Sequence, residues 1–221
     1  VLPSDGSLAQ SSYAVADRLK NPALRFVFVV GIGGSNLGTK AIYDALGGTF
    51  DAYLDPAVQL IFLDTTSPEL LATTQALIAR DISSPDQLAV VLISKSGGTT
   101  ETVYNGEILL AALKSKLGES VHERVVVITD EGSALGKLAD TLGFQQANLP
   151  NQVGGRFSVF SAVGLVPLAL AGIDVESLRA GARDMREVCL HDSDDNSARN
   201  AAAVLYAQLE AGKVIHGLFT F

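Results

Sequence analysis

The sequence predicts an α/β domain of three layers, in which helices cover both faces of a doubly wound, mostly parallel five-stranded sheet. Two observations lead to this prediction. Short apolar runs rich in Val and Ile recur along the chain between longer segments with helical spacing. These runs show almost no alternation of apolar and polar residues, which is expected of strands that are buried on both faces.

Each element follows from its local sequence. Five apolar runs are predicted strands, at residues 26–30, 58–63, 88–93, 124–129 and, more weakly, 144–149. The segments between them are long enough for right-handed crossovers. Ser67-Pro68-Glu69 predicts a helix start with Ser67 as N-cap, and Ser133 is a similar candidate. The predicted helices are residues 11–19, 38–46, 68–78, 100–116, 134–141, 164–171, 175–186 and 198–211.

The composition excludes several classes of protein. Hydrophobic residues make up 48% of the 221 residues and charged residues 18%, which supports a buried core and excludes a disordered chain. Acidic residues outnumber basic ones by 24 to 16, and no run of Lys and Arg could neutralise successive phosphates of a nucleic acid. No nucleic-acid partner is therefore expected, and an anionic ligand would have to be bound by local features.

The cysteine and histidine residues suggest no metal or redox site. Cys189 is the only cysteine, and we expect a packed structural thiol in a reducing compartment, the cytoplasm. His122, His191 and His216 are scattered, so neither a metal site nor a catalytic triad is predicted. No apolar stretch approaches the roughly 18 residues that span a bilayer, and no signal peptide is evident, so no membrane partner is expected.

Two Gly-rich loops are the first candidates for a binding site. Residues 31–38 follow the first predicted strand, and residues 94–101 follow the third. Doubly wound folds commonly have the strand order 2-1-3-4-5, in which strands 1 and 3 are neighbours at the topological switch point. With this order, both loops would line one crevice at the carboxyl ends of the strands.

The second loop has the chemistry of a phosphate cradle. Its hydroxyl groups surround a pair of glycines at the start of a predicted helix, where free amides and the helix dipole favour an anion. An ammonium group adds positive charge. An ordinary capped turn is the alternative interpretation of such a cluster. The residues that could bind the phosphate are Ser94, Lys95, Ser96, Thr99 and Thr100.

Nucleotide-binding motifs fit the Gly-rich loops less well. A Walker A loop ends in Gly-Lys-Ser/Thr, and this triplet does not occur in the chain. For a dinucleotide fingerprint, Gly31 and Gly33 are correctly spaced, but Asn36 occupies the last Gly position. A dinucleotide-binding domain therefore remains a minor alternative.

A third cluster follows the last predicted strand. Gly154 and Gly155 precede Arg156, whose permanent charge could stabilise a developing oxyanion in the same crevice. A surface salt bridge is the competing interpretation of Arg156, and the residues alone do not decide between the two.

The three clusters together resemble the glucose-6-phosphate isomerase family. The matching motifs are Gly-Ile-Gly-Gly-Ser from residue 31, Ser-Lys-Ser from residue 94 and Gly-Gly-Arg-Phe-Ser from residue 154. The resemblance implies a flavodoxin-like sugar-isomerase (SIS) domain. It also implies interconversion of glucose 6-phosphate and fructose 6-phosphate through an enediolate, without metal or organic cofactor, by a homodimer.

The resemblance assigns roles to particular residues. Arg156 would stabilise the enediolate, Gly34 and Ser35 would line the sugar, and Ser94, Lys95, Ser96, Thr99 and Thr100 would hold the phosphate. The family's catalytic Glu lies in a Glu-Ser-x-Gly-Lys segment that does not occur in this sequence, and its ring-opening His and final Lys come later still. Gly98 stands where family loops often have Thr.

The resemblance also implies how the chain is divided. Residues 1–190 would form the first SIS domain, and residues 191–221 a connecting helix and the first strand, 214–221, of a truncated second domain. We therefore expect a fragment of a longer enzyme that lacks the catalytic base. A sugar-phosphate sensor that binds without catalysis is the alternative.

Overall fold

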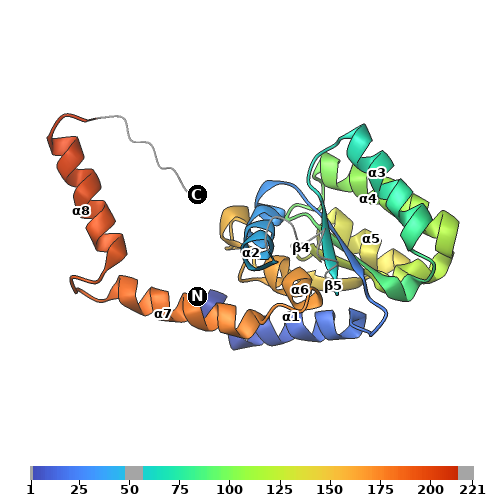
Figure 1. Ribbon diagram of the computed structural model, residues 1–221, viewed down its shortest axis with the longest axis horizontal. Helices are drawn as coiled ribbons and strands as arrows, with labels where there is room; N and C mark the ends of the chain where they lie inside the picture. Colours follow the sequence, from blue (N-terminus) through green and yellow to red (C-terminus); the bar gives the residue numbers. More distant parts are fainter. Residues whose placement is uncertain (1, 48–56, 214–221) are drawn as a thin grey trace. The chain divides into compact units, whose positions relative to one another are not determined.

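The computed structural model describes residues 2–47 and 57–213, and its centre is one sheet of five parallel strands (Figure 1). The strand order is β2-β1-β3-β4-β5, which confirms the order expected for a doubly wound fold. Every strand agrees with its predicted run to within about one residue at each end. The strands are β1 (Phe26–Val30), β2 (Gln59–Leu63), β3 (Leu88–Ile93), β4 (Val125–Thr129) and β5 (Gln145–Asn148).

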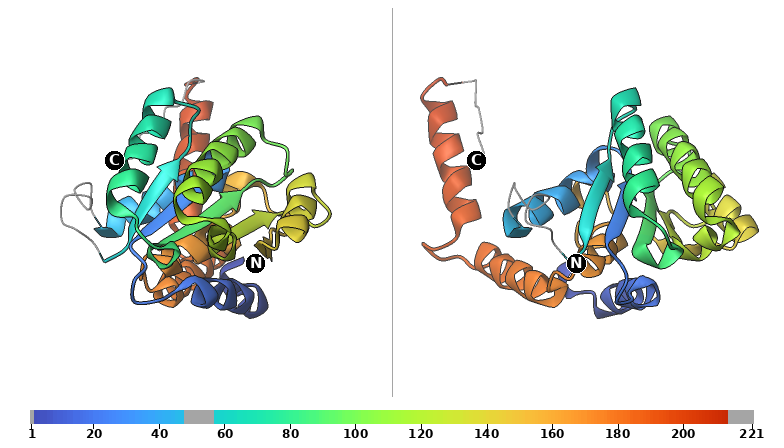
Figure 2. Two further views of the ribbon diagram at one scale, coloured as in Figure 1. Left: turned by 90° about the vertical axis from the view of Figure 1, so that its right-hand side faces the viewer. Right: turned by 45° about the vertical axis from the view of Figure 1, so that its right-hand side comes forward.

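Helices cover both faces of the sheet, as the views in Figures 1 and 2 show. The first face carries α3 (Pro68–Asp81), α4 (Thr100–Leu117) and α5 (Ala134–Leu142). The opposite face carries α1 (Gly6–Leu19), α2 (Leu37–Gly47) and α6 (Ala162–Leu170). The predicted three-layer α/β fold is thus confirmed.

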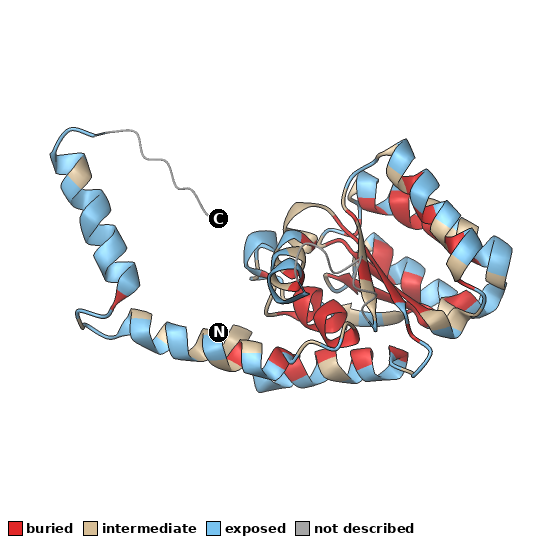
Figure 3. Ribbon diagram, in the orientation of Figure 1, coloured by how far each residue is buried: buried red, intermediate tan, exposed pale blue. Residues whose placement is uncertain are grey.

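The core explains why the strands lack an apolar and polar alternation. Phe26, Phe28 and Val30 belong to the cluster that packs under α3, α4 and α5. Their neighbours Val27 and Val29 are also fully buried, and successive side chains of a strand point to opposite faces. Every residue of α6 is buried on that second face, so both sides of β1 are covered (Figure 3).

The serine side chains expected to cap helices do so. The Ser67 hydroxyl accepts a hydrogen bond from the Leu70 amide at 3.2 Å, and Pro68 begins α3. The Ser133 hydroxyl accepts one from the Gly136 amide at 3.0 Å and caps α5. Each bond satisfies one of the amides that a helix start leaves without an intrahelical partner.

The chain separates into two compact units, residues 1–175 and residues 176–221. The second unit contains α7 (Val175–Leu190), apart from its first residue, and α8 (Ser197–Glu210). The domain boundary expected after residue 190 stays a prediction. The strand expected at residues 214–221, and His216 with it, lie outside the described residues. Within those residues, no helix combines the length and apolar character needed to cross a membrane.

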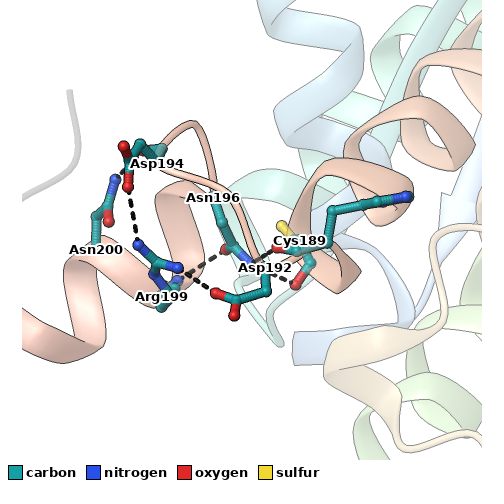
Figure 4. A network of polar contacts seen from close by, with 7 residues as sticks. Cys189, Asp192, Asp194, Asn196, Arg199 and Asn200 are labelled. Carbon is teal, nitrogen blue, oxygen red and sulfur yellow. Dashed lines mark hydrogen bonds and ion pairs between the residues drawn. The ribbon is translucent and has the colours of Figure 1, made fainter.

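A polar network joins the two helices of the second unit (Figure 4). The Asn196 side chain donates to the Cys189 carbonyl oxygen at 2.9 Å and accepts a hydrogen bond from the Arg199 amide at 2.9 Å, which caps α8. The Arg199 guanidinium pairs with Asp192 and Asp194. The expected fully packed environment of Cys189 is only partly found, because its side chain is half-buried.

Candidate functional site

Three loops lie beside one another at the carboxyl ends of the strands. They are residues 31–36 after β1, residues 94–99 after β3 and residues 149–158 after β5. Val30 aligns with Leu92 of β3, so β1 and β3 end at the same edge of the sheet. The third loop returns from the edge strand β5 to contact the first loop through two single-turn helices, η2 (Gly33–Ser35) and η6 (Gly155–Phe157).

The first loop is compact, and its close contacts require glycine at its start. A Cβ atom on Gly31 would lie 2.9 Å from Cβ of Ser35 and 3.1 Å from the carbonyl oxygen of Ile93. The Asn36 side chain is fully buried and donates to the Gly31 carbonyl oxygen at 2.6 Å. These contacts fold the loop back on itself, so that Gly34 faces the third loop.

The second loop brings hydroxyl groups to the start of α4. The Ser94 hydroxyl is buried and donates to Thr99 Oγ1 at 3.0 Å, and the Ser96 hydroxyl accepts a hydrogen bond from the Gly98 amide at 3.3 Å. Thr99 is the N-cap residue, yet in the described part of the chain it makes no side-chain capping bond. The first amides of α4 therefore keep the positive end of the helix open to an anion.

The second loop is supported from behind by the start of α5. Gly97 has a φ of +71°, and a Cβ atom there would lie 2.8 Å from Cβ of Ser133 and 2.9 Å from the Leu135 amide nitrogen. The Thr129 hydroxyl donates to the Ser94 carbonyl oxygen at 2.7 Å and shares a 2.8 Å hydrogen bond with the Ser133 hydroxyl. Glycine at position 97 is thus needed for both its conformation and its lack of a side chain.

The third loop is fastened to the first at Gly34. A Cβ atom on Gly34 would lie 2.3 Å from the Gly155 carbonyl carbon and 2.7 Å from the Arg156 amide nitrogen. The buried Ser158 hydroxyl lies 3.1 Å from the Gly34 carbonyl oxygen and 2.6 Å from that of Gly155, and it donates toward both. The two backbones are therefore in direct contact.

Arg156 is exposed on this third loop. Among the residues that the structure describes, no ion pair joins Arg156 to an acidic side chain, so the alternative of a surface salt bridge finds no support there. Its guanidinium is free to meet an anionic ligand.

Lys95 connects the second and third loops. Its ammonium group donates to the carbonyl oxygen of Asn151 at 2.8 Å and to that of Val153 at 3.0 Å. Lys95 thus points toward the loop that carries Arg156.

All the site residues expected from the sequence lie on these three loops or in the first turn of α4. Sequence reasoning gave no role to Ser158 or Asn36, although both belong to the clusters that it singled out. Asn36 bonds within its own loop, to Gly31, whereas Ser158 also reaches the Gly34 carbonyl, which lies 124 residues away in sequence and has no local signal. His122 does not join the site: it lies in η5 (Glu119–Arg124), with its ring against Phe144 at 5.1 Å.

A cavity of about 520 Å³ is lined mainly by residues of α4 and α5. Its lining is mainly apolar and includes Leu92, Leu135 and Phe144, and it meets the second loop only at Gly97. Among residues 2–47 and 57–213, no group of three or more His, Cys, Asp or Glu side chains could hold a metal ion.

Comparison with known proteins gives a consistent family. Residues 19–211 match the model of the family described as phosphoglucose isomerase. A glucose-6-phosphate isomerase of Exiguobacterium sibiricum is 37% identical over 217 residues, which are 94% of this chain and 47% of the relative. One of Fusobacterium nucleatum is 37% identical over 185 residues, covering 80% of this chain and 40% of the relative.

Solved structures agree with these relatives. A hypothetical protein from Thermus thermophilus superposes with a TM-score of 0.80 at 33% identity, over 94% of this chain and 47% of the other. A glucose-6-phosphate isomerase from Chlamydia trachomatis gives a TM-score of 0.63 at 29% identity, over 86% of this chain and 33% of the other. The chain spans less than half the length of these relatives. Its fold, its loop motifs and the match over residues 19–211 show that it belongs to the phosphoglucose isomerase family.

Proposed function

We propose that this chain is the phosphate-binding half of an isomerase that interconverts glucose 6-phosphate and fructose 6-phosphate. The observation that supports this most is the meeting of the three family motifs at the carboxyl ends of β1, β3 and β5. The complete enzyme would act in the cytoplasm as a homodimer. The substrate would lie across the loops, with its phosphate on the second loop and its reacting carbons near the first and third.

The phosphate would sit at the start of α4. The backbone amides there and the hydroxyl groups of Ser96, Thr99 and Thr100 can donate hydrogen bonds to its oxygens. Ser94 is buried beneath them and fixes the position of Thr99 through the 3.0 Å bond between their hydroxyl groups. The charge of Lys95 adds to the favourable potential of the helix terminus in this acidic chain.

The sugar end would be bound by the first and third loops. By the family resemblance, Gly34 and Ser35 would border the sugar. Glycine at position 34 is what permits the close approach of the first loop to Gly155. The Arg156 guanidinium would stabilise the negative charge that develops when the substrate becomes an enediolate. This charge is absent from the ground state, so the interaction would favour the transition state in particular.

Proton transfer needs a group that these residues do not supply. Moving a proton between C1 and C2 requires a base within hydrogen-bond reach of the carbon that is deprotonated. The Glu-Ser-x-Gly-Lys segment of the family does not occur in the sequence. We assign the base and the ring-opening acid to another part of the full-length enzyme. Their absence from this sequence leaves a non-catalytic sugar-phosphate-binding domain as the second candidate.

The proposal is tested by calorimetric titration of the chain with 6-phosphogluconate, together with crystals soaked in the same compound. The phosphate should lie against residues 94–100, and Ser96→Ala should weaken binding by about 0.5–3 kcal/mol, the range for one lost hydrogen bond. Ser120→Ala is a matched control, because Ser120 lies in η5 at the opposite end of the strands. Binding of the phosphate on residues 31–38 alone would overturn the assignment, and an absence of any binding would overturn the function.

A further inference from the structure

Lys95 is oriented differently from what its position suggests. It lies between Ser94 and Ser96 in a loop suited to anions, where an ammonium group is expected to face the ligand. Its nitrogen instead donates to two backbone carbonyls on another loop, those of Asn151 at 2.8 Å and Val153 at 3.0 Å. An ammonium group has three protons, so most of its donor capacity is used in these two bonds.

The segment that Lys95 holds is one that needs an external restraint. Residues 150–153 form a turn closed by a 2.8 Å bond from the Val153 amide to the Pro150 carbonyl oxygen. Gly154 and Gly155 follow at once, and two glycines in succession give the backbone unusual freedom. Arg156 comes directly after them. Without a fixed point before the glycines, the direction of Arg156 would be poorly defined.

Two attachments, one on each side of the glycine pair, together fix the loop. Lys95 holds the carbonyls before the pair, and the Ser158 hydroxyl, after the pair, donates to the Gly34 carbonyl oxygen of the first loop at 3.1 Å. Hydrogen bonds from a charged donor are stronger than those between neutral groups, so the Lys95 attachment is well suited to holding a turn that is followed by two glycines. It also spans 56 and 58 residues of sequence, which makes it a tertiary link between loops.

We propose that Lys95 is a positioning residue for Arg156. Through its bonds to Asn151 and Val153 it sets the place of the third loop relative to the phosphate cradle. The distance between the group that holds the phosphate and the group that meets the enediolate is thereby fixed. The assignment of a phosphate and an enediolate to these two groups rests on the proposed function, whereas the attachment of the third loop by Lys95 does not.

The first experiment follows backbone hydrogen exchange in the 221-residue chain without ligand. Lys95→Met keeps the length of the side chain and removes its donors. Exchange in residues 151–157 should become at least about tenfold faster, while exchange in β1 and β3 stays the same. Lys137→Met is the matched control, since Lys137 is exposed on α5. Unchanged exchange in residues 151–157 of the Lys95 variant would overturn the proposal.

The second experiment compares two ligands. Inorganic phosphate occupies only the cradle, whereas 6-phosphogluconate also places a carboxylate near the enediolate end. Lys95→Met should lower the affinity for phosphate by less than about fivefold and the affinity for 6-phosphogluconate by more than about tenfold. Arg156→Ala should give a similar loss for 6-phosphogluconate, and the double variant should lose no more than either single variant.

The outcomes separate the proposal from the function on which it depends. Equal losses for both ligands, with an additive double variant, would make Lys95 an ordinary phosphate ligand and overturn the positioning role. If the unaltered chain bound neither ligand, the proposed function would fail, and the exchange experiment would still decide whether Lys95 holds the third loop.

Discussion

The backbones of Gly34 and Gly155 touch, with a Cβ atom on Gly34 placed 2.3 Å from the Gly155 carbonyl carbon. This contact joins the loop after β1 to the loop after β5. It is reinforced by the hydroxyl of Ser158, which lies 124 residues from its acceptor Gly34 in the sequence. A glycine at position 34 is therefore a requirement of the tertiary structure.

Gly34→Ala should destabilise the chain and disturb the third loop. The added methyl group cannot avoid the Gly155 backbone without a shift of η2 or η6, and overpacking of this kind typically costs about 1–3 kcal/mol. Urea unfolding measures the loss. Gly98→Ala is the control, because among the described residues nothing lies within 4 Å of its Cβ position. Equal unfolding midpoints for the two variants would contradict the contact.

Ser133→Ala should affect both stability and phosphate binding, whereas Ser67→Ala should affect stability alone. Each serine caps one helix, and the loss of a cap costs about 0.5–2 kcal/mol. Ser133 in addition bonds to Thr129 and lies behind Gly97, so its removal loosens the second loop. Thermal unfolding and phosphate titration of both variants provide the comparison. A loss of phosphate affinity in Ser67→Ala would show that the effect is not specific to the loop.

Arg124→Met should lower the free energy of unfolding without changing ligand binding. The Arg124 side chain is buried and donates to the carbonyl oxygens of Leu88 at 2.9 Å and Leu19 at 2.6 Å, and burial lowers the pKa of its guanidinium. Methionine would leave these carbonyls without a donor, at about 1–3 kcal/mol for each unsatisfied group. Urea unfolding and phosphate titration test this. The exposed Arg18, changed to Met, should behave like the unaltered chain.

Glu69→Gln should remove a contribution to stability that the Glu69 carboxylate makes at neutral pH and loses at acid pH. The backbone amide of Glu69 and the Ser67 hydroxyl hold the pKa of the Glu69 carboxyl below its ordinary value. A lowered pKa stabilises the folded state above the unfolded pKa, and this stabilisation is lost as pH falls through the folded pKa. The stability difference between the unaltered chain and Glu69→Gln should therefore shrink between neutral pH and about pH 3. Urea unfolding at several pH values measures it, and a constant difference would contradict it.

The chain alone should bind 6-phosphate sugars and yet fail to isomerise them at the rate of a complete enzyme. Loss of a general base typically lowers a rate by about 10²–10⁴. A coupled assay on the purified chain measures turnover, and Arg156→Ala controls for contaminating host isomerase. Turnover of tens per second that disappears in Arg156→Ala would mean that a carboxylate among these residues acts as the base.

The sequence predicts the fold well where burial dominates. The apolar run at residues 26–30 identifies β1 because both faces of that strand are covered by helices. The start of α1 is placed too late, at residue 11 instead of Gly6, because the cap formed by Asp5 and the Leu8 amide precedes Gly6 and Ser7, which have low helix propensity. β5 is shorter than its predicted run, since an edge strand with alternating burial has a weaker pattern.

The sequence is enough to propose the residues of the candidate site, but it does not identify their hydrogen-bond partners. Gly-rich and hydroxyl-rich loops after β1 and β3 can be recognised locally, because their chemistry lies within a few successive residues. The two acceptors of Lys95 and the Gly34 acceptor of Ser158 are backbone carbonyls on other loops, and a carbonyl leaves no signature in the sequence. Only the tertiary structure shows that Lys95 faces the third loop.

The links between the loops also bear on how the chain folds. Contacts between residues far apart in sequence form late, because closing the intervening chain costs entropy before any contact compensates for it. An intermediate that has paired only β1, β2 and β3 would have the second loop but not Asn151, Val153 or Gly155 beside it. If the proposed function holds, the ability to bind a sugar phosphate across the loops is acquired only when β5 has joined the sheet, and ligand binding would then serve as a kinetic signal for that last step.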